Sequence, residues 1–268
     1  MDNGSGPETL KRIREALDSA SKALVPFLAG SLEAKPKSSG YGPVTEADRT
    51  VDRVLREVLL REGEGWLSEE SVDDFRRLEK SRVWVVDPLD GTMEFLAGVP
   101  EWCVSVAMVE NGRPVAGGVC NPVTGELFLG SVSEGVTYND RPVQATKREC
   151  LNGAVILASR SEFKRGEWER FGKAPFVIRP MGSVAYKLAL VAAGMADATW
   201  TLSPKNEWDI AAGVALVEAA GGFAQGLEGR SLSFNSKSVL VSGLLAGGLA
   251  MRPELTDYLG RHASLKSA

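Results

Sequence analysis

The spacing of apolar residues changes along this chain and predicts where helices and strands lie. Residues 8–28 carry apolar side chains at intervals of three and four, which indicates an amphipathic helix. A second stretch with the same spacing begins after Thr45, a suitable helix cap, and ends near Gly63. The mixture of Lys, Pro, Ser and Gly at 35–43, between these two helices, predicts an exposed, mobile loop.

Runs of β-branched and other apolar residues predict strands, and their context changes after the middle of the chain. The earlier strands are separated by turn signals such as Asn111-Gly112, which favours an antiparallel sheet. From residue 154 the strands alternate with predicted helices at 183–193 and 208–220, and a short helix is expected after Arg252. The expected strands span residues 66–68, 83–86, 103–108, 114–120, 126–132, 154–158, 175–179, 198–202, 227–234 and 239–242.

The change of pattern near residues 147–152 predicts a soft boundary within one compact unit. We expect an N-terminal α+β half at 1–150, which contains the antiparallel sheet, and a C-terminal α/β half at 151–268. A chain of 268 residues is long enough to bury a substantial core in this arrangement.

Composition and charge narrow the class of protein. The chain is 44% hydrophobic and 25% charged, as in an ordinary globular protein. Its net charge of −4 argues against binding to a nucleic-acid polymer or an anionic membrane. No apolar run reaches the roughly 18 residues that a membrane span needs. Residues 1–7 are polar and lack an apolar signal core, so we expect a cytoplasmic protein.

Cysteine and histidine are too scarce to carry the chemistry. Cys103, Cys120 and Cys150 are far apart in the sequence, so a disulfide framework or thiolate zinc site is not expected, and all three are interpreted as small buried residues. His262 is the only histidine, which excludes a multi-histidine metal site. Any nucleophilic triad would depend on that one residue. Candidate chemistry therefore lies with the carboxylates.

Two carboxylates follow the short apolar, β-branched strand that begins the stretch at residues 83–92. Pro88 stands between Asp87 and Asp90 and cannot donate a backbone hydrogen bond, so the strand is expected to stop and turn there. Paired acids at a strand end suit a hard cation that prefers oxygen ligands. The alternative is that Asp90 only caps the following helix, but a cap would need one acid rather than two.

Gly91 and Thr92 follow these acids and open a segment that can begin a helix. The free N–H groups at a helix N-terminus form a natural site for phosphate. A metal site and a phosphate site in one place indicate phosphoryl-transfer chemistry.

Other acids lie at the ends of predicted elements. Glu69 and Glu70 follow a short strand, and since consecutive side chains point to opposite sides, one is expected to be solvated and the other to join Asp87. Asp48 and Asp209 lie in the first turns of two predicted helices, where each could be no more than a partner of the helix dipole.

Three motifs occur in a diagnostic order: Glu-Glu-Ser at 69–71, Asp-Pro-Leu-Asp-Gly-Thr at 87–92 and Trp-Asp-Ile-Ala-Ala-Gly at 208–213. Together they resemble the inositol monophosphatase superfamily of lithium-sensitive, Mg²⁺-dependent phosphatases. The resemblance runs from residues 44–48 to 219–222. It implies an α/β (α+β) fold, a layered α-β-α-β-α sandwich with two sheets between layers of helices.

The resemblance also implies two or three Mg²⁺ ions. The implied ligands come from separate segments, four of them acids and one a backbone carbonyl: Glu70, Asp87, Leu89, Asp90 and Asp209. Glu70, Asp87 and the Leu89 carbonyl would hold one ion, and Asp87, Asp90 and Asp209 a second. Most of these ligands belong to the N-terminal half, and the C-terminal half would supply Asp209 and substrate contacts.

By the same resemblance, the catalytic residues are Asp48, Glu70 and Thr92. A weaker third ion would lie near Glu70 and Asp48, and Thr92, paired with Asp48, would orient a metal-bound water. The implied substrate contacts are Asp90, Gly91, Thr92, Gly182, Ser183 and Asp209. The implied partner is a small phosphorylated metabolite, and family members often form homodimers.

The superfamily divides its substrates among inositol phosphates, 3′-phosphoadenosine 5′-phosphate and sugar bisphosphates. Inositol phosphatases usually have a glutamate several residues before Trp-Asp, but residues 202–206 contain none and Glu207 directly precedes Trp208. Segments 91–95, 158–161 and 207–209 resemble the 3′(2′),5′-bisphosphate nucleotidase branch, although Met93 replaces its usual lysine. The sequence slightly favours the adenosine bisphosphate over inositol 1-phosphate or fructose 1,6-bisphosphate.

Three cations could bind the second phosphate of such a substrate: Arg160, Lys187 and Lys205. The alternative for each is an ordinary surface cation. A non-catalytic module that binds a phosphorylated ligand is a second class of function, although all the implied metal ligands and Thr92 are present.

Overall fold

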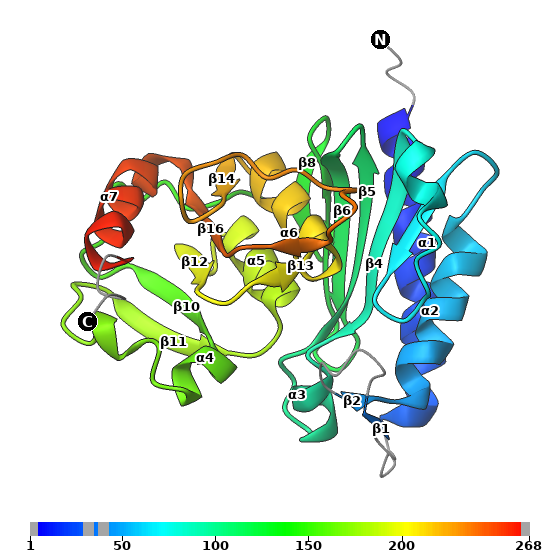
Figure 1. Ribbon diagram of the computed structural model, residues 1–268, viewed down its shortest axis with the longest axis horizontal. Helices are drawn as coiled ribbons and strands as arrows, with labels where there is room; N and C mark the ends of the chain where they lie inside the picture. Colours follow the sequence, from blue (N-terminus) through cyan, green and yellow to red (C-terminus); the bar gives the residue numbers. More distant parts are fainter. Residues whose placement is uncertain (1–4, 29–34, 37–42, 264–268) are drawn as a thin grey trace.

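The computed structural model describes residues 5–28, 35–36 and 43–263. The loop expected at 35–43 therefore lies largely outside the described residues. Figure 1 shows helices and sheets alternating in five layers, which confirms the predicted α-β-α-β-α sandwich. In the described part of the chain, no helix has the length and apolar character needed to cross a membrane.

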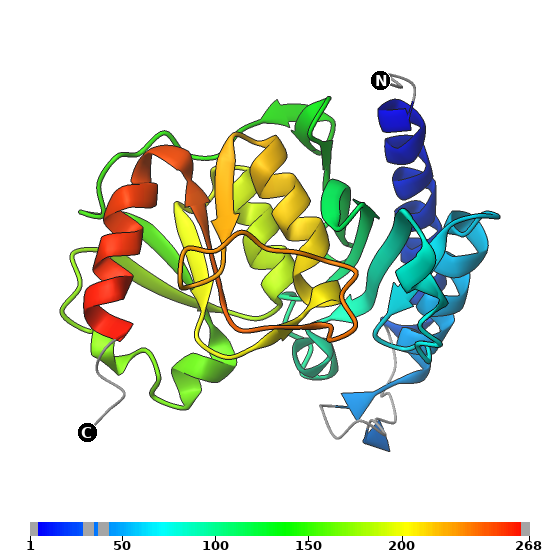
Figure 2. The same ribbon diagram turned by 45° about the horizontal axis from the view of Figure 1, so that its top comes forward.

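The first layer consists of α1 (Ser5–Leu24), continued by the short η1 (Val25–Phe27), and α2 (Glu46–Leu59). Their apolar faces bury Leu17 and Leu55 against Trp84 and other sheet residues. These two helices cover one side of the molecule, and α7 covers the opposite side (Figure 2).

The second layer is a seven-stranded sheet in the order β3-β4-β5-β6-β7-β8-β9. Its strands are mostly antiparallel neighbours along the chain, and only β3 and β4 are parallel. The strands are β3 (Gly65–Ser68), β4 (Arg82–Asp90), β5 (Cys103–Glu110), β6 (Arg113–Asn121), β7 (Glu126–Ser131), β8 (Gly135–Tyr138) and β9 (Arg141–Val143). The smaller elements nearby are the strand pair β1 (Lys35–Pro36) and β2 (Pro43–Val44), η2 (Arg76–Glu79) and α3 (Thr92–Leu96).

The central layer is the pair of helices α5 (Val184–Ala192) and α6 (Glu207–Ala219). Both are buried between the two sheets, which explains why apolar residues occur all around them. The helices pack closely at Gly213, where an added Cβ would lie 2.3 Å from the Cβ of Leu188.

The fourth layer is a five-stranded sheet in the order β11-β10-β12-β16-β14, and α7 (Arg252–Ala263) lies outside it. Trp168, Phe171 and Trp200 form an aromatic cluster beneath α7. The strands are β10 (Val155–Ser159), β11 (Val177–Met181), β12 (Ala198–Thr201), β14 (Gly222–Gln225) and β16 (Leu244–Gly248). The remaining elements are α4 (Arg160–Lys164), η3 (Glu169–Phe171), β13 (Lys205–Asn206), β15 (Leu240–Val241) and η4 (Leu249–Met251).

The expectation that the central strand stops at Pro88 was wrong. Strand β4 continues through Pro88 to Asp90. Its pairing with β5 shifts between Asp87, opposite Ser105, and Asp90, opposite Cys103. The missing N–H of Pro88 falls inside this irregular step, where the regular ladder of hydrogen bonds is already interrupted.

The strand expected at 227–234 is not formed, and the sheet instead uses β14 and β16. The cysteine prediction was right for Cys103 and Cys120, which are buried, and wrong for Cys150, which is exposed. His262 lies in α7, where its ring stacks on Tyr258.

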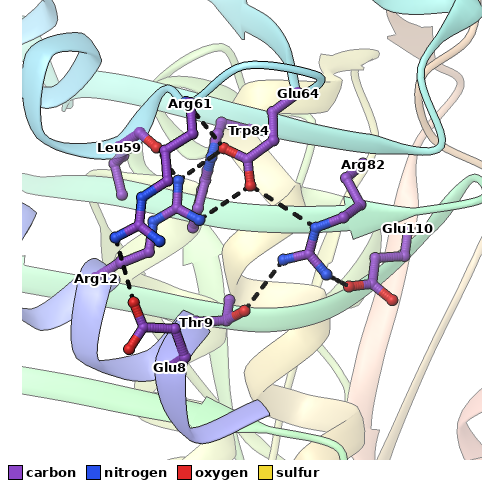
Figure 3. Close-up of polar contacts among 9 residues, drawn as sticks. All are labelled: Glu8, Thr9, Arg12, Leu59, Arg61, Glu64, Arg82, Trp84 and Glu110. Carbon is purple, nitrogen blue, oxygen red and sulfur yellow. Dashed lines mark hydrogen bonds and ion pairs between the residues drawn. The ribbon is translucent and has the colours of Figure 1, made fainter. Parts of the chain in front are cut away.

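A buried ionic network joins the first helices to the start of β4 (Figure 3). The carboxylate of Glu64 accepts hydrogen bonds from Arg12 Nη1 at 3.0 Å, Arg12 Nη2 at 2.7 Å and Trp84 Nε1 at 2.9 Å. Arg82 extends the network to Glu110 on β5. Since Arg82 is the first residue of β4 and Asp90 its last, the network anchors the end of the strand that lies away from the paired acids.

Candidate active site

The acids from separate motifs meet in one pocket of about 270 Å³. It lies where β4 ends and where α3, α5 and α6 begin. Its ionisable lining consists of five acids and three bases: Glu69, Asp87, Asp90, Glu94, Asp209, Arg160, Lys187 and Lys205. Of the other residues selected from the sequence, Leu89, Gly91, Thr92, Gly182 and Ser183 also line this pocket.

Glu69 lines the pocket, and Glu70, the acid predicted to do so, does not. Both follow β3, whose last residue is Ser68. The Ser68 hydroxyl accepts a hydrogen bond from the backbone N–H of Glu70 at 3.3 Å. The chain thus turns directly after β3, and it is the first acid of the pair that lines the pocket.

Asp87 and Asp90 are held by hydrogen bonds to one of their oxygens. Asp87 Oδ1 accepts the N–H of Leu89 at 3.0 Å. Asp90 Oδ2 accepts the Ser183 hydroxyl at 2.6 Å and the N–H of Ala185, in the first turn of α5, at 2.7 Å. These two donors fix one oxygen of Asp90 at the N-terminus of α5.

Asp209 is anchored in a similar way at the start of α6. Its Oδ2 accepts the N–H of Asn206 at 2.9 Å in a capping box. Burial, and then the negative charges of Asp90 and Glu69, raise the pKa of Asp209 to about 8. The acids therefore repel one another unless a cation lies among them.

Asp48 lies behind the pocket and is almost fully buried. Its Oδ2 accepts the N–H of Thr45 at 2.8 Å and the Thr45 hydroxyl at 2.6 Å. The hydroxyl of Thr92 lies 3.4 Å from Asp48 Oδ1 and 3.2 Å from the carbonyl oxygen of Leu89. The two residues that the resemblance pairs are thus within hydrogen-bonding distance.

The donor set fits a divalent cation such as Mg²⁺. Within the described residues, no three His, Cys, Asp or Glu side chains form a preformed metal-binding group. The pocket nevertheless gathers acids from β4, from α6 and from the turn after β3, and Asp90 and Asp209 each use one oxygen in the hydrogen bonds above. Mg²⁺ binds a few carboxylates and keeps several waters, so it needs no closed protein cage.

The acids that surround Arg160 were not predicted from the sequence to belong to the site. Its Nη2 donates to Glu101, its Nε lies 3.7 Å from Glu94 Oε1, and Glu101 also accepts the N–H of Gly182 at 2.8 Å. Burial raises the pKa of Glu94. Glu94 was part of a recognised motif, whereas only the folded chain shows that Glu101 belongs to this wall.

Glu207, which directly precedes Trp208, is not among the residues that line the pocket. Its carboxylate accepts the N–H groups of Asn235 and Ser236 at 2.7 and 2.9 Å. Arg77 donates to the same segment, to the Asn235 side chain at 2.7 Å. Glu207 therefore holds a loop in place.

The chain is similar to known proteins over most of its length. The model of the inositol monophosphatase family matches residues 8–259. An inositol-1-monophosphatase of Rhizobium meliloti is 35% identical over 207 residues, which cover 74% of this chain and 77% of that protein. A fructose-1,6-bisphosphatase/inositol-1-monophosphatase of Thermotoga maritima is 31% identical over 219 residues, 80% of this chain and 83% of that protein. The crystal structure of extragenic suppressor protein suhB from Bartonella henselae superposes with a TM-score of 0.80 at 30% identity, over 96% of this chain and 98% of that one.

Proposed function

This chain belongs to the inositol monophosphatase family and is a phosphatase that acts on phosphoric monoesters, and we propose that it uses Mg²⁺ and an activated water to do so. The observation that carries the proposal is the convergence of Glu69, Asp87, Asp90 and Asp209 on one pocket beside Thr92. These acids come from distant segments, and their mutual repulsion is relieved when cations bind among them.

Two or three Mg²⁺ ions would be held by the acids that line the pocket. Glu69, in place of Glu70, would bind one ion together with Asp87 and the Leu89 carbonyl, and Asp90 and Asp209 would complete a second site with Asp87. When bound, Mg²⁺ lowers the pKa of a coordinated water and neutralises the phosphoryl oxygens.

Thr92 and Asp48 would position the attacking water. The Thr92 hydroxyl can donate its one proton to Asp48 Oδ1, which leaves the oxygen of Thr92 to accept a hydrogen bond from the water. Asp48 is itself fixed by two hydrogen bonds from Thr45, so the acceptor is preorganised. Any function of Glu70 would be indirect.

Substrate would be held by groups on the opposite wall and at the start of α3. The backbone N–H groups of Gly91 and Thr92 would bind phosphoryl oxygens. Gly91 has φ of 101°, and an added Cβ would lie 3.0 Å from the Glu101 carbonyl oxygen, so only glycine fits there. Ser183 and Gly182 would line the leaving-group side.

For the substrate we favour 3′-phosphoadenosine 5′-phosphate. The segment before Trp208 supplies Lys205 to the pocket and no glutamate, which suits an anionic leaving group better than a neutral polyol. Inositol 1-phosphate is the second candidate, because the related proteins named above include inositol-1-monophosphatases. Lithium inhibition, a cytoplasmic location and a homodimer are further expectations of the family resemblance.

The test is phosphate release by the purified protein with Mg²⁺ from 3′-phosphoadenosine 5′-phosphate, inositol 1-phosphate and fructose 1,6-bisphosphate at matched concentrations. The highest kcat/KM is expected for the adenosine bisphosphate. Asp90→Asn should reduce turnover by orders of magnitude in a folded protein. Asp257→Asn, which changes an exposed acid on α7, is the matched control. A folded Asp90→Asn protein with near-normal turnover would refute the mechanism, and ligand binding without turnover by the wild type would favour a binding module.

A further inference from the structure

Three cationic side chains line the pocket, and they differ in how many hydrogen bonds and ion pairs each already makes within the protein. An anionic group on the substrate is bound most favourably by a cation whose charge is not already balanced by neighbouring acids and which has donors to spare. The surroundings of Arg160, Lys187 and Lys205 therefore decide which of them can recognise such a group.

Arg160 already lies between two carboxylates. Its guanidinium donates to Glu101 and lies 3.7 Å from Glu94, so its positive charge is balanced within the wall. Glu101 is in turn bound to the backbone of Gly182. A phosphate that approached Arg160 would meet the negative charge of Glu94, which also lines the pocket. Arg160 therefore stabilises this wall of the pocket by pairing with its acids.

Lys187 has no donor left for a ligand. It is 2% exposed, and its Nζ donates to the carbonyl oxygens of Ser183 at 2.7 Å and of Met181 and Gly182 at 3.3 Å. An ammonium group has three N–H donors, and three acceptors use all of them. The three carbonyls belong to consecutive residues, and Ser183 has φ of 49°, which non-glycine residues rarely adopt. Lys187 thus stabilises the strained segment that binds Asp90.

Lys205 differs from both. In the part of the chain that the structure describes, its ammonium group makes no hydrogen bond or ion pair, and its side chain is partly exposed in the pocket wall. It lies close enough to Asp209 for its positive charge to lower the pKa of that acid. This partly opposes burial and the charges of Asp90 and Glu69, which raise the same pKa.

The backbone that carries Lys205 is held firmly on both sides. Strand β13 pairs with β15, so that Lys205 lies opposite Val241. The buried carboxylate of Glu162 accepts the N–H groups of Leu202 and Ser203 at 3.0 and 2.9 Å. A fixed backbone with an unpaired ammonium group loses little conformational freedom when it binds an anion.

We propose that Lys205 is the specificity-determining residue of this enzyme and binds a second phosphate on the leaving group of the substrate. The proposal rests on the function proposed above, since it concerns the same pocket. A second phosphate gains an ion pair with Lys205, whereas a monophosphate leaves the ammonium group in water. The enzyme should therefore prefer a bisphosphate to a monophosphate with the same scissile ester.

The kinetic test compares 3′-phosphoadenosine 5′-phosphate with adenosine 3′-phosphate, which has the same scissile ester and no second phosphate. Lys205→Met should reduce the ratio of their kcat/KM values by about tenfold or more, mainly through KM for the bisphosphate. Lys205→Arg should retain most of the ratio. Lys173→Met, which removes an exposed cation that does not line the pocket, should leave it unchanged.

A binding test needs no turnover. Calorimetry with Mg²⁺ should show that Lys205→Met weakens binding of adenosine 5′-phosphate several-fold and that of adenosine hardly at all. If Lys205→Met reduced kcat/KM equally for the two nucleotides, or weakened binding of adenosine 5′-phosphate and adenosine equally, the assignment of Lys205 would be overturned and the phosphatase mechanism would stand. A wild-type preference for inositol 1-phosphate would have the same consequence. If the wild type released phosphate from no substrate, the proposed function would fail, and the calorimetric comparison would still decide the role of Lys205.

Discussion

Replacing Glu64 by glutamine should destabilise the protein more than any replacement of a surface acid. The Glu64 carboxylate is 9% exposed and accepts four hydrogen bonds, three from Arg12 and Trp84 and one from the N–H of Arg61 at 3.1 Å (Figure 3). Its partner Arg12 is 5% exposed. Glutamine keeps the shape and removes the charge, so it leaves a buried guanidinium without a counterion.

The magnitude follows from this burial. Removing one partner of a buried ion pair costs about 3–5 kcal/mol, a large part of the roughly 5–15 kcal/mol that stabilises a typical protein. For a chain of this size each kcal/mol shifts the melting temperature by about 2–4 °C, so Tm should fall by roughly 6–20 °C. The matched control is Glu57→Gln, because Glu57 pairs with Arg53 on the exposed face of α2. That exposed pair should contribute about 0.3–0.5 kcal/mol.

The same network predicts how stability depends on pH. Burial raises the pKa of Glu64, but hydrogen bonds from Arg12 and Trp84 outweigh it, so the net pKa lies below the ordinary value of 4.5. A lowered folded-state pKa gives stability that is complete above the unfolded value and is lost as pH falls through the folded value. Below about pH 4.5 the wild type should therefore lose more stability than Glu64→Gln.

Urea denaturation monitored by tryptophan fluorescence, at several pH values, measures both effects. The double variant Arg12→Met with Glu64→Leu should be more stable than the sum of the two single changes implies, because it leaves no unpaired buried charge. A Glu64→Gln protein within about 1 kcal/mol of the wild type at neutral pH, or with an unchanged acid response, would refute the reasoning.

Three further predictions concern the site and its support. Ser183→Ala removes a donor to Asp90 and the cap of α5. It should lower kcat by about tenfold in steady-state kinetics and the free energy of unfolding by about 1 kcal/mol in thermal melting. An unchanged kcat would contradict this role of Ser183. Gly213→Ala places a Cβ 2.3 Å from Leu188 Cβ and should cost about 1–3 kcal/mol in urea denaturation. Gly260→Ala, in helix α7 at a position with nothing within 4 Å of the added Cβ, controls for loss of a helical glycine itself. Removal of metal with a chelator should abolish phosphate release and lower Tm, and added Mg²⁺ should restore both; full activity after chelation would exclude the metal-dependent mechanism.

The amino-acid sequence predicts the parts of this fold whose local pattern and tertiary role agree. Helices α1 and α2 have one apolar face because they cover one side of a sheet. The hairpin strands from β5 to β7 coincide with three apolar runs in the sequence, of which β5 is rich in valine, and turn signals separate them. In each of these elements local propensity and burial favour the same structure.

Strands β14 and β16 could not be predicted in this way. Both are short and rich in glycine and alanine, and they form because each pairs along its length with a neighbouring strand. The segment 227–234, expected to be a strand, contains apolar residues but has no partner strand in the described sheets. Whether these segments form strands therefore depends on pairing with a neighbouring strand and not on their local strand propensity.

Which of Glu69 and Glu70 lines the active-site pocket also depends on strand pairing, and the local sequence does not show it. Adjacent residues point to opposite sides of a strand, so the pattern indicates that one acid faces the pocket but not which one. The register of β3 on β4, which pairs Ser68 with Val86, fixes the answer. No property of the two glutamates themselves distinguishes them.

The structural alternatives weighed above were a helix cap for Asp90 and a partner of the helix dipole for Asp209. Neither excludes a metal ligand, because a carboxylate has two oxygens. Each acid uses one oxygen for a structural hydrogen bond at a helix start, to Ala185 in α5 or to Asn206 before α6. The second oxygen and the negative charge remain for a cation. Asparagine can keep the accepting oxygen, but it loses the charge, and its NH2 group replaces the second oxygen that would bind a cation. Asp90→Asn therefore separates chemistry from folding, whereas Asp90→Ala would remove both and leave a loss of activity without a clear cause.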